Sequence, residues 1–274
     1  MPRRFRFQGA AIGAAGRITE PFQEIIEVQA ATALPEIGGH GFARSTAFRY
    51  RQILRFEEAH SEVTGSRIED YEGRPVHCTL IKSTVDGLNV MEMVTADRIV
   101  ANLVSTHWGD PEGEPSVKLV GSRFENLRIA GVPVKVHLAT DIFDRFDTHK
   151  SLREAYKADP QVRSLFEDAT LKHRYHEAPS VIQRWFYRPQ EDDSEMPATK
   201  GITSFSLVRK LEPEGSGLEC WGHVIHLPGF GTIRLAELEI SRFSRHITML
   251  QIDLGSPVKG KLMASSSEDG GTDW

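Results

Sequence analysis

Two segments combine histidine and carboxylate side chains at spacings that could bind a metal ion. His173 and His176 are three residues apart, so on a helix both imidazoles would share one face and could bind zinc. Asp141 and Asp144 lie just before a predicted helix, where carboxylate oxygens could hold a hard cation. The histidine pair has no third ligand at a suitable spacing. The acidic segment continues with Asp147 and His149 but lacks the EF-hand spacing and its loop glycine. Polar residues that stabilise helix ends explain both segments without a metal and are the favoured interpretation.

A second chemical feature is the run Arg184-Trp185-Phe186-Tyr187-Arg188. Arginine, tryptophan and tyrosine are enriched in the residues that contribute most to protein interfaces. The run is therefore the best candidate for a contact surface with a protein partner. A buried strand that follows the helical segment is the alternative interpretation.

Arg49, Arg51 and Arg55 form a basic stripe that alternates with the aromatic residues of the same segment. A platform for nucleic acid needs basic and aromatic groups on one face, whereas this alternation separates them. The net charge of −5 and the pI near 6.1 also argue against a general nucleic-acid binder. The stripe therefore indicates a solvated or partner-facing strand. Residues 1–55 hold eight arginines, no lysine and four glutamates, a balance of +4.

The elements that must position these residues are mostly strands. Val132–Leu138 alternate between apolar and polar residues, as a half-buried strand does. In 233–240 and 247–254 the apolar positions shift phase midway, which indicates a bulge. We therefore predict a mainly β fold: an antiparallel β-sandwich or barrel-like sheet with bulged strands. Asp86-Gly87 and Pro228–Gly231 are predicted hairpin turns.

One region predicts helices instead. Ser151-x-x-Glu154 has the spacing of a capping box, and Asp159-Pro160 resembles an N-cap followed by proline at the first helical position. Apolar residues then recur at helical spacing. We expect two short helices within 148–175, inserted into a single β-rich domain that spans 1–264. Residues 265–274 are polar and rich in glycine and serine, so we expect a flexible tail there.

Residues 63–80 and 119–138 resemble each other. With two residues skipped, eight of eighteen aligned positions are identical, including Gly73 with Gly131 and Pro75 with Pro133. The pattern predicts a repeated hairpin, although chance similarity between two strand segments stays open.

The second copy, Gly-Ser-x-Phe-x-x-Leu-x-Ile-x-Gly-x-x-Val-x-Val at 121–136, resembles a segment of the bacterial choice-of-anchor P proteins. Val94–Ala101 is similar to the same group. The resemblance covers about residues 90–138 and, more faintly, 230–254. It implies a β-rich, secreted protein without an assigned activity, and it transfers no functional residue.

The sequence also predicts where the protein is located. No apolar run approaches the ~20 residues that a membrane-spanning helix needs. The basic start, Met1–Phe7, has no apolar segment behind it, so it does not resemble a secretory signal. The sequence thus predicts a cytoplasmic protein and leaves a mature extracellular form open. Cys78 and Cys220 are expected to be buried free thiols, although a disulfide stays open.

Three functional hypotheses follow. The chain lacks the Gly-x-Ser-x-Gly elbow, the phosphate loop and the dinucleotide-binding glycine pattern. We therefore favour a non-enzymatic structural or interaction protein that self-associates through sheet edges, with another protein or a second copy as partner. The alternatives are a metal-assisted hydrolase that uses histidines and aspartates within 137–177, and a β-barrel that binds an apolar small molecule. No cofactor is identified.

Overall fold

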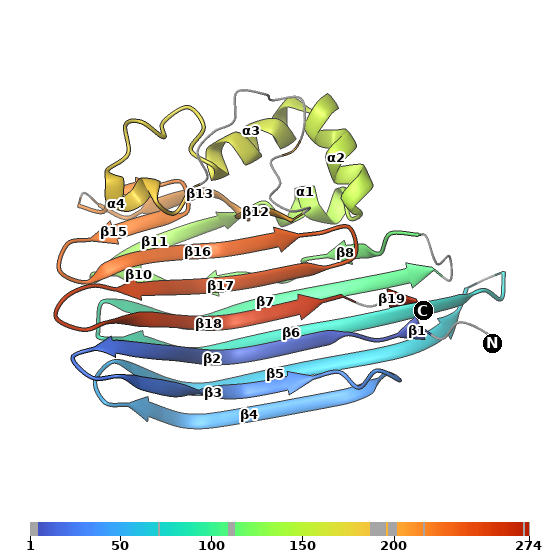
Figure 1. Ribbon diagram of the computed structural model, residues 1–274, viewed down its shortest axis with the longest axis horizontal. Coiled ribbons are helices and arrows are strands. Elements are labelled where there is room, and N and C mark those ends of the chain that lie inside the picture. The colour runs from blue at the N-terminus through green and yellow to red at the C-terminus, as the bar shows by residue number, and fades with distance from the viewer. Residues whose placement is uncertain are drawn as a thin grey trace.

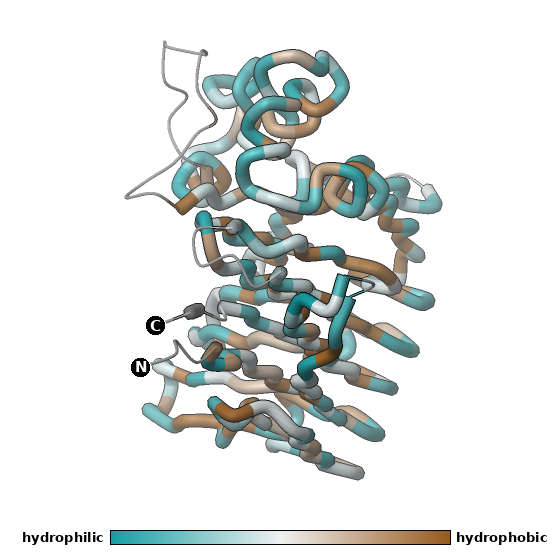
Figure 2. The backbone as a smooth tube through the Cα atoms, turned by 90° about the vertical axis from the view of Figure 1, so that its right-hand side faces the viewer, coloured by the Kyte–Doolittle hydropathy of each residue, from teal (hydrophilic) through white to brown (hydrophobic). Residues whose placement is uncertain are grey.

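The computed structural model contains two antiparallel β-sheets that pack face to face, with helices at one end of the stack (Figures 1 and 2). It describes residues 5–70, 72–108, 113–186, 196, 202–215, 217–270 and 272–273. The prediction of a mainly β, sandwich-like fold is confirmed.

The two sheets are built from different segments of the chain. The first sheet has the spatial order β14 (Cys220–Trp221), β15 (Val224–Leu227), β16 (Gly231–Ile240), β17 (Arg245–Leu254), β18 (Lys259–Asp269), β2 (Gly9–Glu20) and β3 (Glu24–Ala33), with β12 (Thr203–Ser206) also beside β16. The second has the order β13 (Val208–Pro213), β11 (Val132–Leu138), β10 (Arg128–Ile129), β7 (Val94–Trp108), β6 (Pro75–Val90), β5 (Leu54–Glu69) and β4 (Gly39–Tyr50), with β8 (Ser116–Lys118) and β9 (Arg123–Glu125) beside β7. A short ribbon joins β1 (Phe5–Arg6) to β19 (Thr272–Asp273).

Each long strand sends alternate side chains into the space between the sheets. On β16, Ile233, Leu235, Leu238 and Ile240 are fully buried in the main core. The side chains between them point to the outer face of the first sheet. The core therefore fills the interior, and the polar face of β16 lies outside it.

The predicted phase shifts are real and belong to a row of kinks across the first sheet. Ala236 on β16, Ser265 on β18 and Ala30 on β3 all have positive φ, between 50° and 56°. Leu235 pairs with Leu250 and Glu237 pairs with Thr248, so the ladder omits Ala236 and Met249 between them. The register is the same on both sides of the kink, so the expected bulge is absent between β16 and β17, and the left-handed residue itself lets residues on either side of it share one face.

A similar irregularity lies inside β6 of the second sheet, where a hairpin turn was expected. Gly87 has φ 62°, yet β6 runs through it without a break. The prediction of a turn at Asp86-Gly87 is therefore wrong: a glycine beside a polar residue also suits a left-handed kink within a strand. The predicted hairpin at Pro228–Gly231 is confirmed between β15 and β16.

The expected flexible tail is wrong for most of its length, because β18 extends to Asp269 and pairs with β17 and β2. Two of its serines, Ser265 and Ser267, face the second sheet. The Ser265 hydroxyl accepts a hydrogen bond from the Ala101 amide and donates one to the Ser83 carbonyl, and so links the two sheets (2.9 and 3.0 Å). A serine-rich composition therefore does not by itself predict disorder, because hydroxyls that are fully hydrogen-bonded can lie in a core.

The helices follow β11. They are α1 (Thr140–Arg145), α2 (His149–Ala158), α3 (Pro160–Ala169) and α4 (Ser180–Gln183). The two predicted helices correspond to α2 and α3, and Asp159 caps α3 as expected. The predicted capping box is displaced: Thr148 is the N-cap of α2, and Ser151 is the N3 residue that completes the box. Both α1 and α4 lie outside the predicted helices.

The two similar hairpin segments differ in structure. Gly73 and Gly131 both have positive φ at a turn. Gly65, however, lies within β5, where a Cβ atom would contact Phe7, whereas its counterpart Gly121 has φ 83° in a loop. The shared turn glycine is thus a local similarity, and the duplication stays a prediction.

Two further expectations concern cysteines and membranes. Cys78 and Cys220 are both free and half-buried, and burial raises the pKa of the Cys220 thiol. Within the described residues, no helix combines the length and the apolar character that crossing a bilayer requires.

Candidate functional site

The histidines and aspartates singled out for metal binding do not form a shared site. Asp141 pairs with Arg209 (2.6 Å), and Asp144 accepts a hydrogen bond from the Leu119 amide. His173 follows the last long helix in a turn, not on a helix face. Across the part of the chain that the structure describes, no three histidine, cysteine, aspartate or glutamate side chains are grouped as metal ligands. His176 stacks edge-on against Tyr175.

The aromatic segment that was the interface candidate packs onto the first sheet. Phe186 is buried against the His223 ring, with 5.3 Å between ring centroids. Trp185 is half-buried, and Arg184 is exposed. Tyr187 and Arg188 lie outside the described residues. Since two of the three described residues contact the sheet, this segment forms a wall rather than a free surface.

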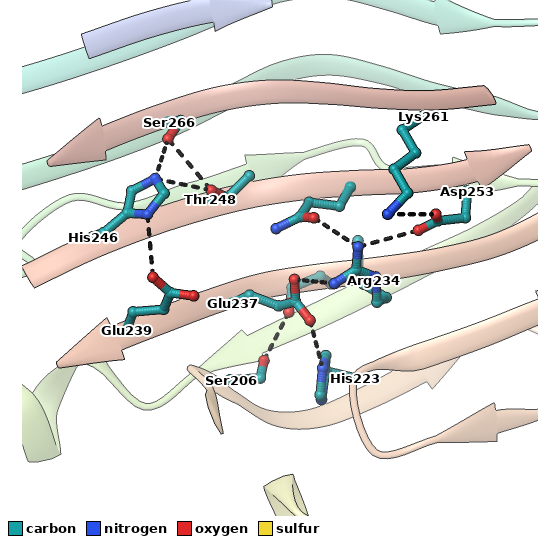
Figure 3. A network of polar contacts seen from close by, with 12 residues as sticks. Ser206, His223, Arg234, Glu237, Glu239, His246, Thr248, Asp253, Lys261 and Ser266 are labelled. Atoms are coloured by element: carbon teal, nitrogen blue, oxygen red, sulfur yellow. Dashed lines mark hydrogen bonds and ion pairs between the residues drawn. The ribbon is translucent and has the colours of Figure 1, made fainter. Parts of the chain in front are cut away.

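A cleft of about 390 Å³ lies between this wall and the outer face of the first sheet. Its volume is in the range of small-molecule sites. It is lined by Arg184, Trp185, Phe186, Ser204, Arg234, Glu237, Glu239, His246, Thr248 and Gln251. Figure 3 shows how β16, β17 and β18 place the polar side chains on one face.

Arg234 is at the centre of the polar network (Figure 3). Its guanidinium donates to Glu237 (2.6 Å), to Gln251 (2.7 Å) and to Asp253 (3.1 Å). One face of the guanidinium lies over the Trp185 ring, with 4.3 Å between the guanidinium carbon and the ring centroid. These contacts hold the planar group in one orientation, which a flexible lysine could not match.

The kink at Ala236 makes this arrangement possible. Arg234 and Glu237 are three residues apart and would project from opposite faces of a regular strand. Because Ala236 has a left-handed backbone conformation (φ 50°), both residues lie on the outer face and pair. Thr248 and Gln251 lie on β17, opposite Glu237 and Arg234.

Glu237 also contacts a buried histidine. The His223 Nε2 atom lies 3.5 Å from its carboxylate, and the His223 side chain is only 5% exposed. Burial by itself would raise the pKa of Glu237, but His223 and Arg234 together outweigh that effect and hold the pKa below its ordinary value. Glu237 is therefore a fixed negative charge rather than a proton donor.

A second polar series begins at the edge of the cleft. The Glu239 carboxylate lies 3.7 Å from His246 Nδ1, and His246 Nε2 lies 2.8 Å from the Ser266 hydroxyl. A carboxylate, an imidazole and a hydroxyl in this order can activate a nucleophile. Ser266 is only 4% exposed, so a substrate carbonyl cannot reach its hydroxyl in this conformation. The series therefore orients the His246 ring toward the cleft.

Two donors in the cleft lining have unused capacity. Within the described residues, neither Trp185 Nε1 nor Arg234 Nε has a hydrogen-bond partner, and both atoms are buried. A buried donor without an acceptor is costly. The lining charges balance, because Arg184 and Arg234 face Glu237 and Glu239. Both unpartnered atoms are closed off from the cleft, so the lining offers a ligand the exposed Arg184 guanidinium and an aromatic wall, with no strong excess of charge.

Sequence reasoning identified the aromatic wall of this cleft but missed its floor. Arg234, Glu237 and His246 alternate with apolar residues on strands that were predicted, so they were indistinguishable from an ordinary wetted face. The phase shift between Leu235 and Leu238 was the available signal, since it places polar residues three apart on one side.

A family model described as "Domain of unknown function (DUF8256)" matches residues 5–241. The match includes the aromatic wall and β16, whereas β17 and β18 follow it. No curated protein and no solved structure matches the chain. The family's description does not mention choice-of-anchor P proteins, so that resemblance stays a prediction.

Proposed function

Because the chain belongs to this family, whose description assigns no activity, we propose its function from the cleft itself: it binds a small polar molecule between Trp185 and the outer face of β16 and β17. The ligand class is a compact ring compound with carbonyl, carboxyl or hydroxyl acceptors. Its flat face would pack against the aromatic wall, and its acceptors would take hydrogen bonds from the exposed Arg184 guanidinium.

The observation that carries this proposal is the cleft of about 390 Å³, in which Trp185 and Phe186 form one wall and Arg234 is fixed by hydrogen bonds on the floor. Binding sites combine aromatic walls with a few fixed polar groups. Here Glu237, Gln251 and Asp253 fix Arg234 before any ligand arrives, which reduces the ordering cost of binding.

Ligand-observed NMR with a library of small polar ring compounds tests the proposal. We expect saturable binding that Trp185→Ala abolishes, because most of the aromatic wall is lost. Trp108→Ala is the matched control, since Trp108 is half-exposed and is not among the lining residues. Binding that survives Trp185→Ala, or a library without any binder, would contradict the proposal.

Self-association is the second candidate, and a separate observation favours it. β3 and β4 are edge strands at the same end of the two sheets (Figure 1). Four large apolar side chains are exposed on these strands or the connection between them: Ile25, Val28, Ile37 and Phe42. Unpaired edges with exposed apolar residues favour pairing with another chain, here a second copy.

The other two hypotheses from the sequence have less support. Asp141 and Asp144 have the separate partners described above, and His173 lies 3.3 Å from Glu167. An apolar ligand inside a barrel would need an interior space, and the side chains of the main core occupy the region between the sheets.

A further inference from the structure

Three arginines that the proposed ligand cleft does not use gather at the opposite end of the fold. Arg49 on β4 and Arg55 on β5 are direct partners in the ladder, and Arg51 lies in the turn that joins the two strands. Together with Asn89 and Glu92 they border a cavity of about 460 Å³. The arginine stripe seen in the sequence is thus folded into a hairpin, which brings its charges around one space.

This arrangement costs energy unless a negative charge lies between the arginines. Like charges directly opposite each other on an antiparallel pair are destabilising. Arg51 is neutralised by Glu24 at 2.6 Å. Arg55 approaches Glu92 only at 3.8 Å, and the Glu92 side chain is 84% exposed, so this surface pair contributes little.

Arg49 has no carboxylate partner among the residues that the structure describes. Its Nε atom donates to the Arg51 carbonyl (3.1 Å), which fixes the direction of the side chain. Both terminal amino groups of the guanidinium have no hydrogen-bond partner among the described residues. A guanidinium held in this way can bind two oxygens of one anion at once. Asn89 lies opposite Arg55 on β6 and adds an amide to the same row.

We propose that this cavity binds a phosphate-bearing anion, with Arg49 and Arg55 as its principal ligands. The excess of positive charge in residues 1–55 would favour the approach of such an anion to a protein that is negative overall. A soluble polyphosphate compound and a phospholipid headgroup share this chemistry.

Titration calorimetry with inorganic tripolyphosphate tests the soluble source, and sedimentation with vesicles of phosphatidylcholine and phosphatidylglycerol tests the lipid source. We expect binding to at least one probe, weakened by added salt and reduced about tenfold or more in Arg49→Ala and in Arg55→Gln. Neither variant should unfold more readily than the wild type, because each removes one of two opposed like charges.

Arg44→Ala is the matched control. Arg44 lies on the same strand with similar exposure, pairs with Glu58, and does not border the cavity. Tripolyphosphate or vesicle binding that is lost in Arg49→Ala and kept in Arg44→Ala supports the site. The proposal is overturned if neither probe binds, or if Arg44→Ala weakens binding as much as Arg49→Ala does.

Discussion

Burial changes the acid–base properties of single side chains in this fold. Asp269 is the clearest case, because it lies fully buried at the end of β18. Burial raises the pKa of its carboxyl to about 7, against the opposing effects of the Ser105 hydroxyl and the Arg245 charge. The sequence predicts a flexible tail here, because nothing in the residues around Asp269 distinguishes a buried aspartate from a solvated one.

The raised pKa makes stability depend on pH in a defined direction. In the unfolded chain the carboxyl loses its proton near its ordinary pKa of 3.8, whereas in the folded chain it keeps the proton until about pH 7. The folded state binds more protons across that window, so its stability from this group is present at low pH and declines as the pH rises from about 4 to 7.

Asp269→Asn should remove this decline and stabilise the protein at pH 8 by roughly 1–4 kcal/mol, since no buried carboxylate then needs to ionise. Urea unfolding at a series of pH values measures the effect. Glu69→Gln, which changes an exposed carboxylate, serves as the control and should change little. An unchanged pH slope in Asp269→Asn would refute this account of Asp269.

At the scale of elements, kinked strands decide which side chains meet. The alternation of apolar residues predicted most strands and even the phase shift within β16. It could not reveal that alanine and serine, rather than glycine, occupy the left-handed positions, because sequence preference for positive φ favours glycine. Nor could it place Trp185 over Arg234, since that contact depends on how the helical insertion folds back onto the sheet.

Gly87 tests the kink in the second sheet. A Cβ atom at this position would collide with the Glu57 side chain, and the φ of 62° disfavours other residues. Gly87→Ala should therefore lower the free energy of unfolding by about 1–3 kcal/mol. Gly73→Ala is the matched control: Gly73 has a similar φ of 74° with open space around it, so its cost should stay near 1 kcal/mol. Equal losses in urea unfolding would mean that crowding at Gly87 contributes nothing.

At the scale of the whole molecule, the sandwich separates three surfaces. The cleft lies on the outer face of the first sheet, the arginine cavity lies at the β4–β5 turn, and the exposed apolar residues lie along β3 and β4. A second copy docked on these edges would leave the cleft accessible, because β16 and β17 are separated from β3 by β18 and β2.

Sedimentation velocity across a range of protein concentrations tests this edge surface. We expect the wild type to form a dimer or larger assembly, and Phe42→Lys, which puts a charge on the exposed edge, to shift it toward monomer. Val120→Lys changes an equally exposed apolar residue elsewhere and should leave the assembly intact. A wild type that sediments as a monomer at every concentration argues against self-association.

A crystal structure with a bound compound from the NMR library is the sharpest test of the cleft beneath Trp185 as a ligand site. We predict electron density for the compound in the cleft, beside Trp185, with an acceptor atom at hydrogen-bond distance from the exposed Arg184 guanidinium. Density for the compound elsewhere, with an empty cleft, would contradict the proposal.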